Sequence, residues 1–325
     1  PENALDNHSS TIRDVALNYA ILTHSVVGDN SSYKVDTVLP TLNSVAITGA
    51  QGDQNSFLNA TDNVSVTATF SEAVIVASGN PTIILAVGSD NRTATYTSGD
   101  NSTRLVYRYM VESGYNDSNG ISIGANALDN SSSTISDPAG NIPDNLTHDA
   151  VSDNSSVKVD TVLPTLNSVA ITGAQGDQNS FLNATDNVSV TATFSEAVIV
   201  ASGNPTIILA VGSDNRTATY TSGDNSTRLV YRYMVESGYN DSNGISIGAN
   251  ALDNSSSTIS DPAGNIPDNL THSAVSDNSS VKVDTTAPSV DNFTMSDTEL
   301  KIGDNATVTL EFSEPVCVST SECTR

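Results

Sequence analysis

The sequence lacks tryptophan, has only six phenylalanines in 325 residues, and has no cysteine before residue 317. Basic residues are also scarce, with 12 lysines and arginines against 37 aspartates and glutamates and a formal net charge of −25. Nucleic acids and anionic lipid surfaces attract proteins mainly through cationic side chains, so neither is expected as a partner. No apolar run reaches the roughly 20 residues that cross a bilayer, so we expect no membrane span in this segment. The acidic surface instead favours a self-repelling chain or a cation binder.

The most informative feature that is present is a tandem repeat. Residues 35–158 and 159–282 are the same sequence, and the single difference between them is Asp149 against Ser273. An enzyme does not need its whole body twice in tandem, whereas a chain that provides length, spacing or multivalency does. We therefore predict a structural protein rather than an enzyme, and we assign no catalytic residues.

Both ends of the chain resemble parts of further repeats. Residues 1–34, continuing into the next VDT, share ALDN, THS, DNSS and KVDT with the late part of a repeat. Residues 283–325 share VDT, a proline and EFSEPV (against TFSEAV) with the early part. We expect residues 1–34 to be the C-terminal piece of a preceding repeat, with about two strands. We expect residues 283–325 to be the N-terminal piece of a following one, with two or three strands, and the chain to be an excerpt of a longer array.

Strand periodicity runs through each repeat. In residues 63–70 (NVSVTATF), valine, alanine and phenylalanine alternate with serine and threonine, which is the pattern of a strand with one buried face. The same alternation marks residues 92–97 and 103–111. Further short strands are expected around residues 45–47, 74–76, 83–87 and 157–159. About seven strands in about 120 residues, separated by turn-forming residues, predict an antiparallel β-sandwich.

Several motifs, taken in order, resemble a known group of proteins. VDTVLP, FSEAV, TATYTSGD, NGISIGANAL, ISDPAGN and VKVDTTAP are similar to the bacterial immunoglobulin-like repeats of giant cell-surface adhesins and biofilm-associated proteins. The resemblance covers essentially the whole chain, although each motif alone is weak. The sequence departs from the usual pattern of these repeats in two ways. Its two full repeats have VLP where TAP is common, and asparagine is unusually frequent. The resemblance implies an extracellular rod of tandem immunoglobulin-like sandwiches, with calcium at the domain junctions.

The usual strand order of such a sandwich brings three distant carboxylates to one end of each repeat. Asp36 lies where the chain enters the repeat, Glu72 is at the end of the second strand, and Asp137 is the first residue of the loop DPAGN. Like charges this close are unfavourable unless a cation or hydrogen bonds offset them, and calcium prefers oxygen ligands. Two interpretations stay open: a calcium site, or aspartates that accept backbone N–H groups in turns. The equivalent residues are Asp160, Glu196 and Asp261 in the second repeat, and Asp284 and Glu314 in the C-terminal piece.

The loop ESGYNDSNG, residues 112–120, is expected at the opposite end of the repeat, facing the next repeat. Asp117 in this loop could add a further ligand to the Asp160 group. The alternative is that Asp117 simply shapes a turn.

Two surface modifications are also predicted. The first repeat has eight Asn-x-Ser/Thr sequons, which suit N-linked glycans where the host has the machinery, or else reflect a polar surface selected for solubility. These sequons begin at Asn59, Asn63, Asn91, Asn101, Asn116, Asn130, Asn145 and Asn154. Cys317 and Cys323 are close enough for a hairpin disulfide in an oxidising compartment, the alternative being two thiols.

The sequence therefore predicts a stalk or spacer of a cell-surface or secreted fibrous adhesin, stiffened by calcium. Its expected partners are neighbouring repeats or other copies, with a host or biofilm surface contacted by domains outside this chain. The alternative is a subunit of an extracellular filament, in which partial end domains are completed by strand addition from a neighbour.

Overall fold

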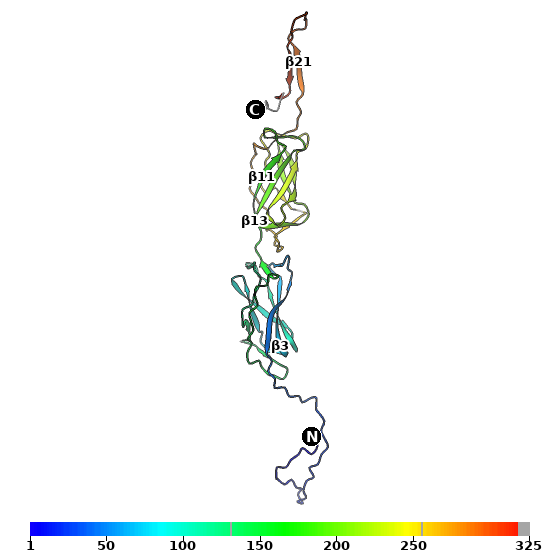
Figure 1. Ribbon diagram of the computed structural model, residues 1–325, viewed down its shortest axis with the longest axis vertical. Coiled ribbons are helices and arrows are strands. Elements are labelled where there is room, and N and C mark those ends of the chain that lie inside the picture. The colour runs from blue at the N-terminus through cyan, green and yellow to red at the C-terminus, as the bar shows by residue number, and fades with distance from the viewer. Residues whose placement is uncertain (131, 255, 318–325) are drawn as a thin grey trace.

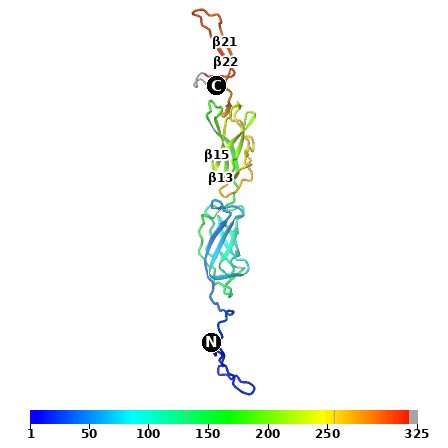
Figure 2. The same ribbon diagram turned by 90° about the vertical axis from the view of Figure 1, so that its right-hand side faces the viewer.

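The computed structural model describes residues 1–130, 132–254 and 256–317. Among these residues all regular structure is β, and the two complete repeats form sandwich-like domains that follow one another in tandem (Figures 1 and 2). No helix of a length and apolarity that would cross a membrane occurs in the described residues. The predicted all-β tandem architecture is confirmed.

The strands of the two repeats correspond one to one. In the first repeat they are β1 (Leu42–Gln51), β2 (Phe57–Leu58), β3 (Asn63–Ser78), β4 (Thr82–Val87), β5 (Asp90–Ser98), β6 (Ser102–Met110), β7 (Asn116–Asp117), β8 (Leu128–Asp129), β9 (Thr134–Ser136) and β10 (Lys158–Asp160). In the second they are β11 (Leu166–Gln175), β12 (Phe181–Leu182), β13 (Asn187–Ser202), β14 (Thr206–Val211), β15 (Asp214–Ser222), β16 (Ser226–Met234), β17 (Asn240–Asp241), β18 (Leu252–Asp253), β19 (Thr258–Ser260) and β20 (Lys282–Asp284).

The large sheet of the first repeat has the strand order β1-β3-β6-β5-β4-β8, with β9 also pairing with β3, and the second repeat has the equivalent order β11-β13-β16-β15-β14-β18, with β19 pairing with β13. The sequence predicts separate strands at 63–70 and 74–76, but β3 is continuous. Its first half pairs with β1 and β6, and the register shifts after Thr69, so that the second half pairs with β9. The strand bends where it changes partner, and Glu72 lies at this bend.

A small sheet, β2-β10-β7, completes the sandwich. Its central strand β10 runs parallel to β2 and antiparallel to β7, with Asp160 opposite Asn116. Val159 and Asp160 therefore belong to the fold of the first repeat, although the sequence period assigns them to the second. The boundary of the folded unit falls after Asp160 rather than after Lys158, and the same holds after Asp284 in the second repeat.

The alternating apolar positions form the core. Val64, Val66 and Ala68 are fully buried and Phe70 is 2 % exposed, which confirms the buried face predicted for residues 63–70. Tyr107 is fully buried and meets Tyr96 edge-to-face with ring centroids 6.0 Å apart. Each repeat thus has its own complete hydrophobic cluster.

The described residues of the two end segments form no such core. Residues 1–34 contain one isolated bridge, Arg13 to Tyr19, and no strand, in contrast to the two strands expected. The equivalent residues of a full repeat pair with β2, β3, β4 and β7, which this segment does not contain. Within residues 283–317, the described part of the C-terminal segment, β21 (Val290–Met295) and β22 (Val308–Phe312) form a hairpin whose apolar side chains are largely exposed.

Candidate cation site at the repeat junction

Three carboxylates converge in each repeat. Asp36, Glu72 and Asp137 form one group, and Asp160, Glu196 and Asp261 form the other, which we call the junction triad. Within each group, one oxygen of every residue lies within 4.8 Å of the others. The convergence expected from the sequence is therefore present.

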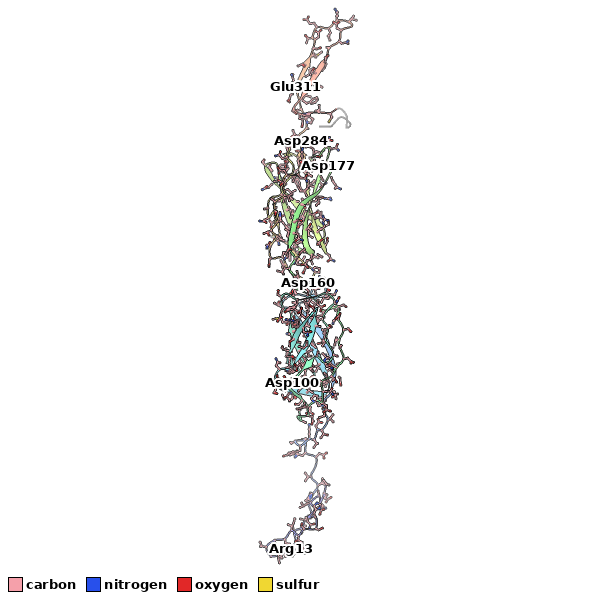
Figure 3. All side chains as sticks on the ribbon, turned by 90° about the vertical axis from the view of Figure 1, so that its left-hand side faces the viewer. Arg13, Asp100, Asp160, Asp177, Asp284 and Glu311 are labelled. Carbon is pink, nitrogen blue, oxygen red and sulfur yellow. The ribbon has the colours of Figure 1, made fainter. Side chains whose placement is uncertain are left out.

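Three different elements position the junction triad. Asp160 is the last residue of β10 in the first repeat, and Figure 3 shows it between the two sandwiches. Glu196 lies at the bend of β13, and Asp261 directly follows β19, which pairs with the second half of β13. The junction triad is therefore shared between repeats, because the first repeat supplies Asp160 and the second supplies the other two residues.

Asp261 is held rigidly by its own loop. It is fully buried, and its Oδ1 accepts the Asn265 backbone N–H at 2.8 Å while its Oδ2 accepts the Asn265 amide, also at 2.8 Å. The same Asn265 amide donates to the Asp160 backbone carbonyl at 2.9 Å. In the equivalent Asp137, burial raises the pKa, but the hydrogen bonds from Asn141, Ala139 and Gly140 outweigh it and leave the pKa below its ordinary value. The turn interpretation is thus correct for these aspartates, and it leaves lone pairs available for a cation.

Glu196 is in the opposite situation. Its Oε1 is buried and has no hydrogen-bond partner among the described residues. Burial, together with the charges of Asp160 and Asp261, raises the pKa of Glu196 from 4.5 to about 7. Burial and the charge of Asp261 also raise the pKa of Asp160, against the effect of a hydrogen bond from Val162. The junction triad therefore contains negative charge that protein donors do not fully offset.

The junction triad could hold a metal ion, and its spacing can be compared with that of calcium ligands. Calcium binds oxygen atoms at 2.3–2.6 Å, so two of its ligands are at most about 5 Å apart, and the separations within the junction triad are inside that limit. Asp160, Glu196 and Asp261 would hold the ion, and the buried Glu196 oxygen would gain a partner. An ion here would offset the repulsion among the three charges.

The two groups differ in their surroundings, although their sequences are identical. Asp36 and Ala139 are exposed, whereas Asp160 is half-buried and Ala263 is 1 % exposed. The cause is the preceding repeat, which covers the second group. The first group is preceded by residues 1–34, which do not form a sandwich.

Hydrogen bonds cross the junction from the first repeat to the loop at 261–265. The Asn55 side chain donates to the Pro262 carbonyl at 2.8 Å, and the Asn59 side chain donates to the Ala263 carbonyl at 3.1 Å. Gly264, at φ +86°, packs so closely against Gln54 that a β-carbon there would collide with its side chain. These contacts fix one loop of the first repeat against the loop that holds Asp261.

The structure does not bring Asp117 to the junction triad. Its carboxylate turns into its own repeat, where it is 6 % exposed and accepts the backbone N–H groups of Gly88, Asn119 and Gly120 at 2.9–3.1 Å. The ligand interpretation is replaced by the turn interpretation for this residue. Its loop does face the linker, since the Gly114 N–H donates to the Thr161 hydroxyl at 2.9 Å.

The C-terminal piece keeps part of the arrangement. The Asp284 side chain accepts the Thr286 N–H at 3.2 Å, as Asp160 accepts that of Val162, and Glu314 again has a buried Oε1 without a partner in the described residues. Cys317 is disulfide-bonded, and Cys323, its expected partner, lies outside the described residues.

The sequons are distributed unevenly around the first repeat. Asn91, Asn101, Asn116 and Asn145 are exposed, and Asn63, Asn130 and Asn154 are half-buried. Asn59 is different, because its amide nitrogen, the atom that a glycan would occupy, is used across the junction. Its counterpart Asn183 in the second repeat is exposed.

Sequence reasoning missed the amide side chains that build this region. Asn265 is the last residue of the motif DPAGN. Its place in that motif, four residues after Asp261, was a signal from which its role could have been predicted. No local signal pointed to Asn55, and Asn59 was interpreted only as a sequon.

Comparisons with known proteins identify no family. No protein-family profile matches the sequence, and no curated protein matches it.

Proposed function

We propose that the chain is a stretch of stalk from a cell-surface or secreted fibrous adhesin, in which calcium binds at the junctions and holds successive repeats in line. The junction triad carries this proposal, because a cation bound there contacts both repeats at once. Calcium at such a site offsets charge repulsion and links two bodies, so it acts on stiffness as well as on stability.

Two further features support a spacer role. Each repeat has its own core, so repeats add length without requiring a new fold. The asparagine bonds from Asn55 and Asn59 position the second repeat independently of any ion. A stalk that projects an adhesive tip needs both properties.

Small-angle scattering of the full chain in calcium and in chelator tests the proposal. We expect a longer, stiffer particle and a higher melting temperature in calcium. Asp160→Asn is the test variant and Asp36→Asn the matched control, since Asp36 joins no preceding sandwich. Identical scattering profiles and melting curves in the two conditions would contradict the calcium part of the proposal.

An alternative function, a filament subunit completed by strand addition, is favoured by one observation. The hairpin β21–β22 exposes apolar side chains, with Phe293 at 61 % and Leu310 at 49 %. A two-stranded hairpin is marginal alone and presents unpaired edges. Mass spectrometry of the native polypeptide separates the two: a start at Pro1 would favour the subunit, and a far longer chain would favour the stalk.

A further inference from the structure

The few cationic side chains of each repeat are not spread evenly. The first repeat has four cationic residues against 13 acidic ones. Three of the four, Arg92, Arg104 and Arg108, are on the neighbouring strands β5 and β6. Residues 63–70, 91–98 and 102–110, which form adjacent strands of the large sheet, contain no aspartate or glutamate. In a chain of net charge −25, these segments carry arginine as their only charged residue type, with Asp90 at the start of β5 and Glu112 just after β6 as the nearest carboxylates along the chain.

A groove lies on this face in both repeats. Its volume is about 490 Å³ in the first repeat and about 540 Å³ in the second, and the same ten sequence positions line it in each. The groove is open to solvent along the sheet, so a ligand there would lie on the strands rather than be enclosed. Because the two repeats have the same sequence over this region, the array presents the same groove twice.

The groove offers hydroxyl, amide and guanidinium groups, together with the Glu112 carboxylate, whose charge is offset by Arg92. Thr93, Thr95 and Thr97 alternate along β5 and are exposed, and Thr95 lies opposite Arg108 in the β5–β6 register. The Thr97 hydroxyl donates to the Val106 carbonyl at 3.0 Å, whereas within the described part of the chain the Thr93 and Thr95 hydroxyls form no hydrogen bond.

Of the two arginines that line the groove, Arg92 already has a charged partner, whereas Arg108 can meet a ligand. Arg92 pairs with Glu112 at 3.0 Å and stacks on the Tyr115 ring at 4.0 Å. Arg108 is exposed and forms no ion pair among the described residues. Asn63 and Asn91 also line the groove, and Met110, 57 % exposed, adds an apolar surface.

We propose that this groove binds an acidic polysaccharide, with a sugar carboxylate on Arg108 and sugar hydroxyls on the threonine and asparagine side chains. The guanidinium group suits a carboxylate because it can donate two parallel hydrogen bonds. The row of polar side chains along β5 suits a chain-like ligand with many hydroxyls. A second copy of this protein also carries carboxylates, but the exposed threonine and asparagine side chains beside Arg108 suit a ligand that is rich in hydroxyl groups.

The tandem repeat makes the proposal stronger for a polymeric ligand. Arg108 and Arg232 occupy equivalent positions in the two repeats, so one chain offers the same groove twice. Two weak sites on one protein bind a long polymer more tightly than either site alone. The acidic remainder of the protein repels such a ligand over long range, but at 0.15 M salt this repulsion is screened beyond about 8 Å while direct contacts persist.

The test uses calorimetric titration of the full 325-residue chain at about 0.15 M salt with a six-residue oligogalacturonate and, for comparison, neutral maltohexaose. The test variant is Arg108→Gln with Arg232→Gln. The matched control is Lys158→Gln with Lys282→Gln, which removes the same charge away from the groove. Thr95→Val with Thr219→Val removes the hydroxyls and keeps all charges.

We expect the arginine variant to weaken uronate binding at least tenfold, since a hydrogen bond to a charged group contributes a factor of about 10–100. The lysine variant should stay within about twofold of the parent, and the threonine variant should fall between the two. Melting temperatures of all variants should match the parent, because the altered side chains are outside the core.

Four results would overturn the proposal. They are absence of uronate binding, equal losses in the arginine and lysine variants, equal affinity for maltohexaose, or reversible self-association by sedimentation velocity that the arginine variant abolishes. The last result would assign this face to a second copy of the chain.

Discussion

Replacing Glu196 with glutamine should stabilise the second repeat when no calcium is present, although it removes a charged side chain from a polar site. Burial and two neighbouring aspartates raise the pKa of Glu196 from 4.5 to about 7. Because this carboxyl binds its proton more tightly when folded, ionising it above pH 7 costs stability. The stabilising contribution is fully present below about pH 4.5 and is lost as the pH rises through about 7.

The magnitude follows from the same numbers. A rise from 4.5 to about 7 corresponds to at most about 3.5 kcal/mol, at about 1.4 kcal/mol per pKa unit. Glu196 is only half-buried, so solvent screening reduces this to about 1 kcal/mol. For a domain of this size, that raises the melting temperature by roughly 4 °C.

The assay is differential scanning calorimetry of the parent and Glu196→Gln in chelator, at pH 5 and pH 8. At pH 8 the variant should melt higher, and at pH 5 the gap should shrink. In calcium the order should reverse at pH 8, because the variant loses a ligand. Glu72→Gln is the matched control: burial, Asp36 and Asp137 raise the Glu72 pKa too, but no preceding sandwich covers it, so its effect should be smaller. A variant that melts below the parent in chelator at pH 8 would refute the reasoning.

Two further predictions concern the first repeat. Replacing Asn55 and Asn59 together with alanine should loosen the junction, because both bonds to the loop at 261–265 are lost. Scattering in chelator should then show a broader range of shapes with nearly unchanged melting, whereas Asn183→Ala, at an exposed position, should change neither. In material from a glycosylating host, glycopeptide mapping should find Asn91 and Asn101 occupied and Asn59 bare. Since the repeats yield the same peptides, this mapping needs an Asn183→Gln, Asn215→Gln and Asn225→Gln background, and an occupied Asn59 alongside an intact junction would contradict it.

Much of the fold followed from local pattern. The alternation in residues 63–70 identified the buried face, because a strand turns successive side chains to opposite sides. The repeat of 124 residues, from 35–158 to 159–282, identified two equivalent domains without any tertiary information. To predict the convergence of Asp36, Glu72 and Asp137, the strand order that the resemblance implies was also required.

Tertiary structure decided which domain each residue serves. Asp160 is the second residue of the second copy of the sequence, yet β10 needs β2 and β7 as pairing partners, so Asp160 belongs to the first sandwich. Asp117 lies on a loop near the junction, but three backbone N–H groups in its own repeat turn its carboxylate inward.

Ala139 and Ala263 show most clearly what the sequence alone cannot predict. They occupy the same position in identical loops, yet the first is exposed and the second is 1 % exposed. Local sequence cannot distinguish them, because burial here depends on whether another sandwich lies in front of the loop. The sequence alone determined the repetition, the all-β class and the buried face of residues 63–70, but not the continuity of β3 or the absence of strands in residues 1–34. Contact between the repeats decided which acidic group is enclosed, which asparagines bond across the junction, and how far the Glu196 pKa is raised.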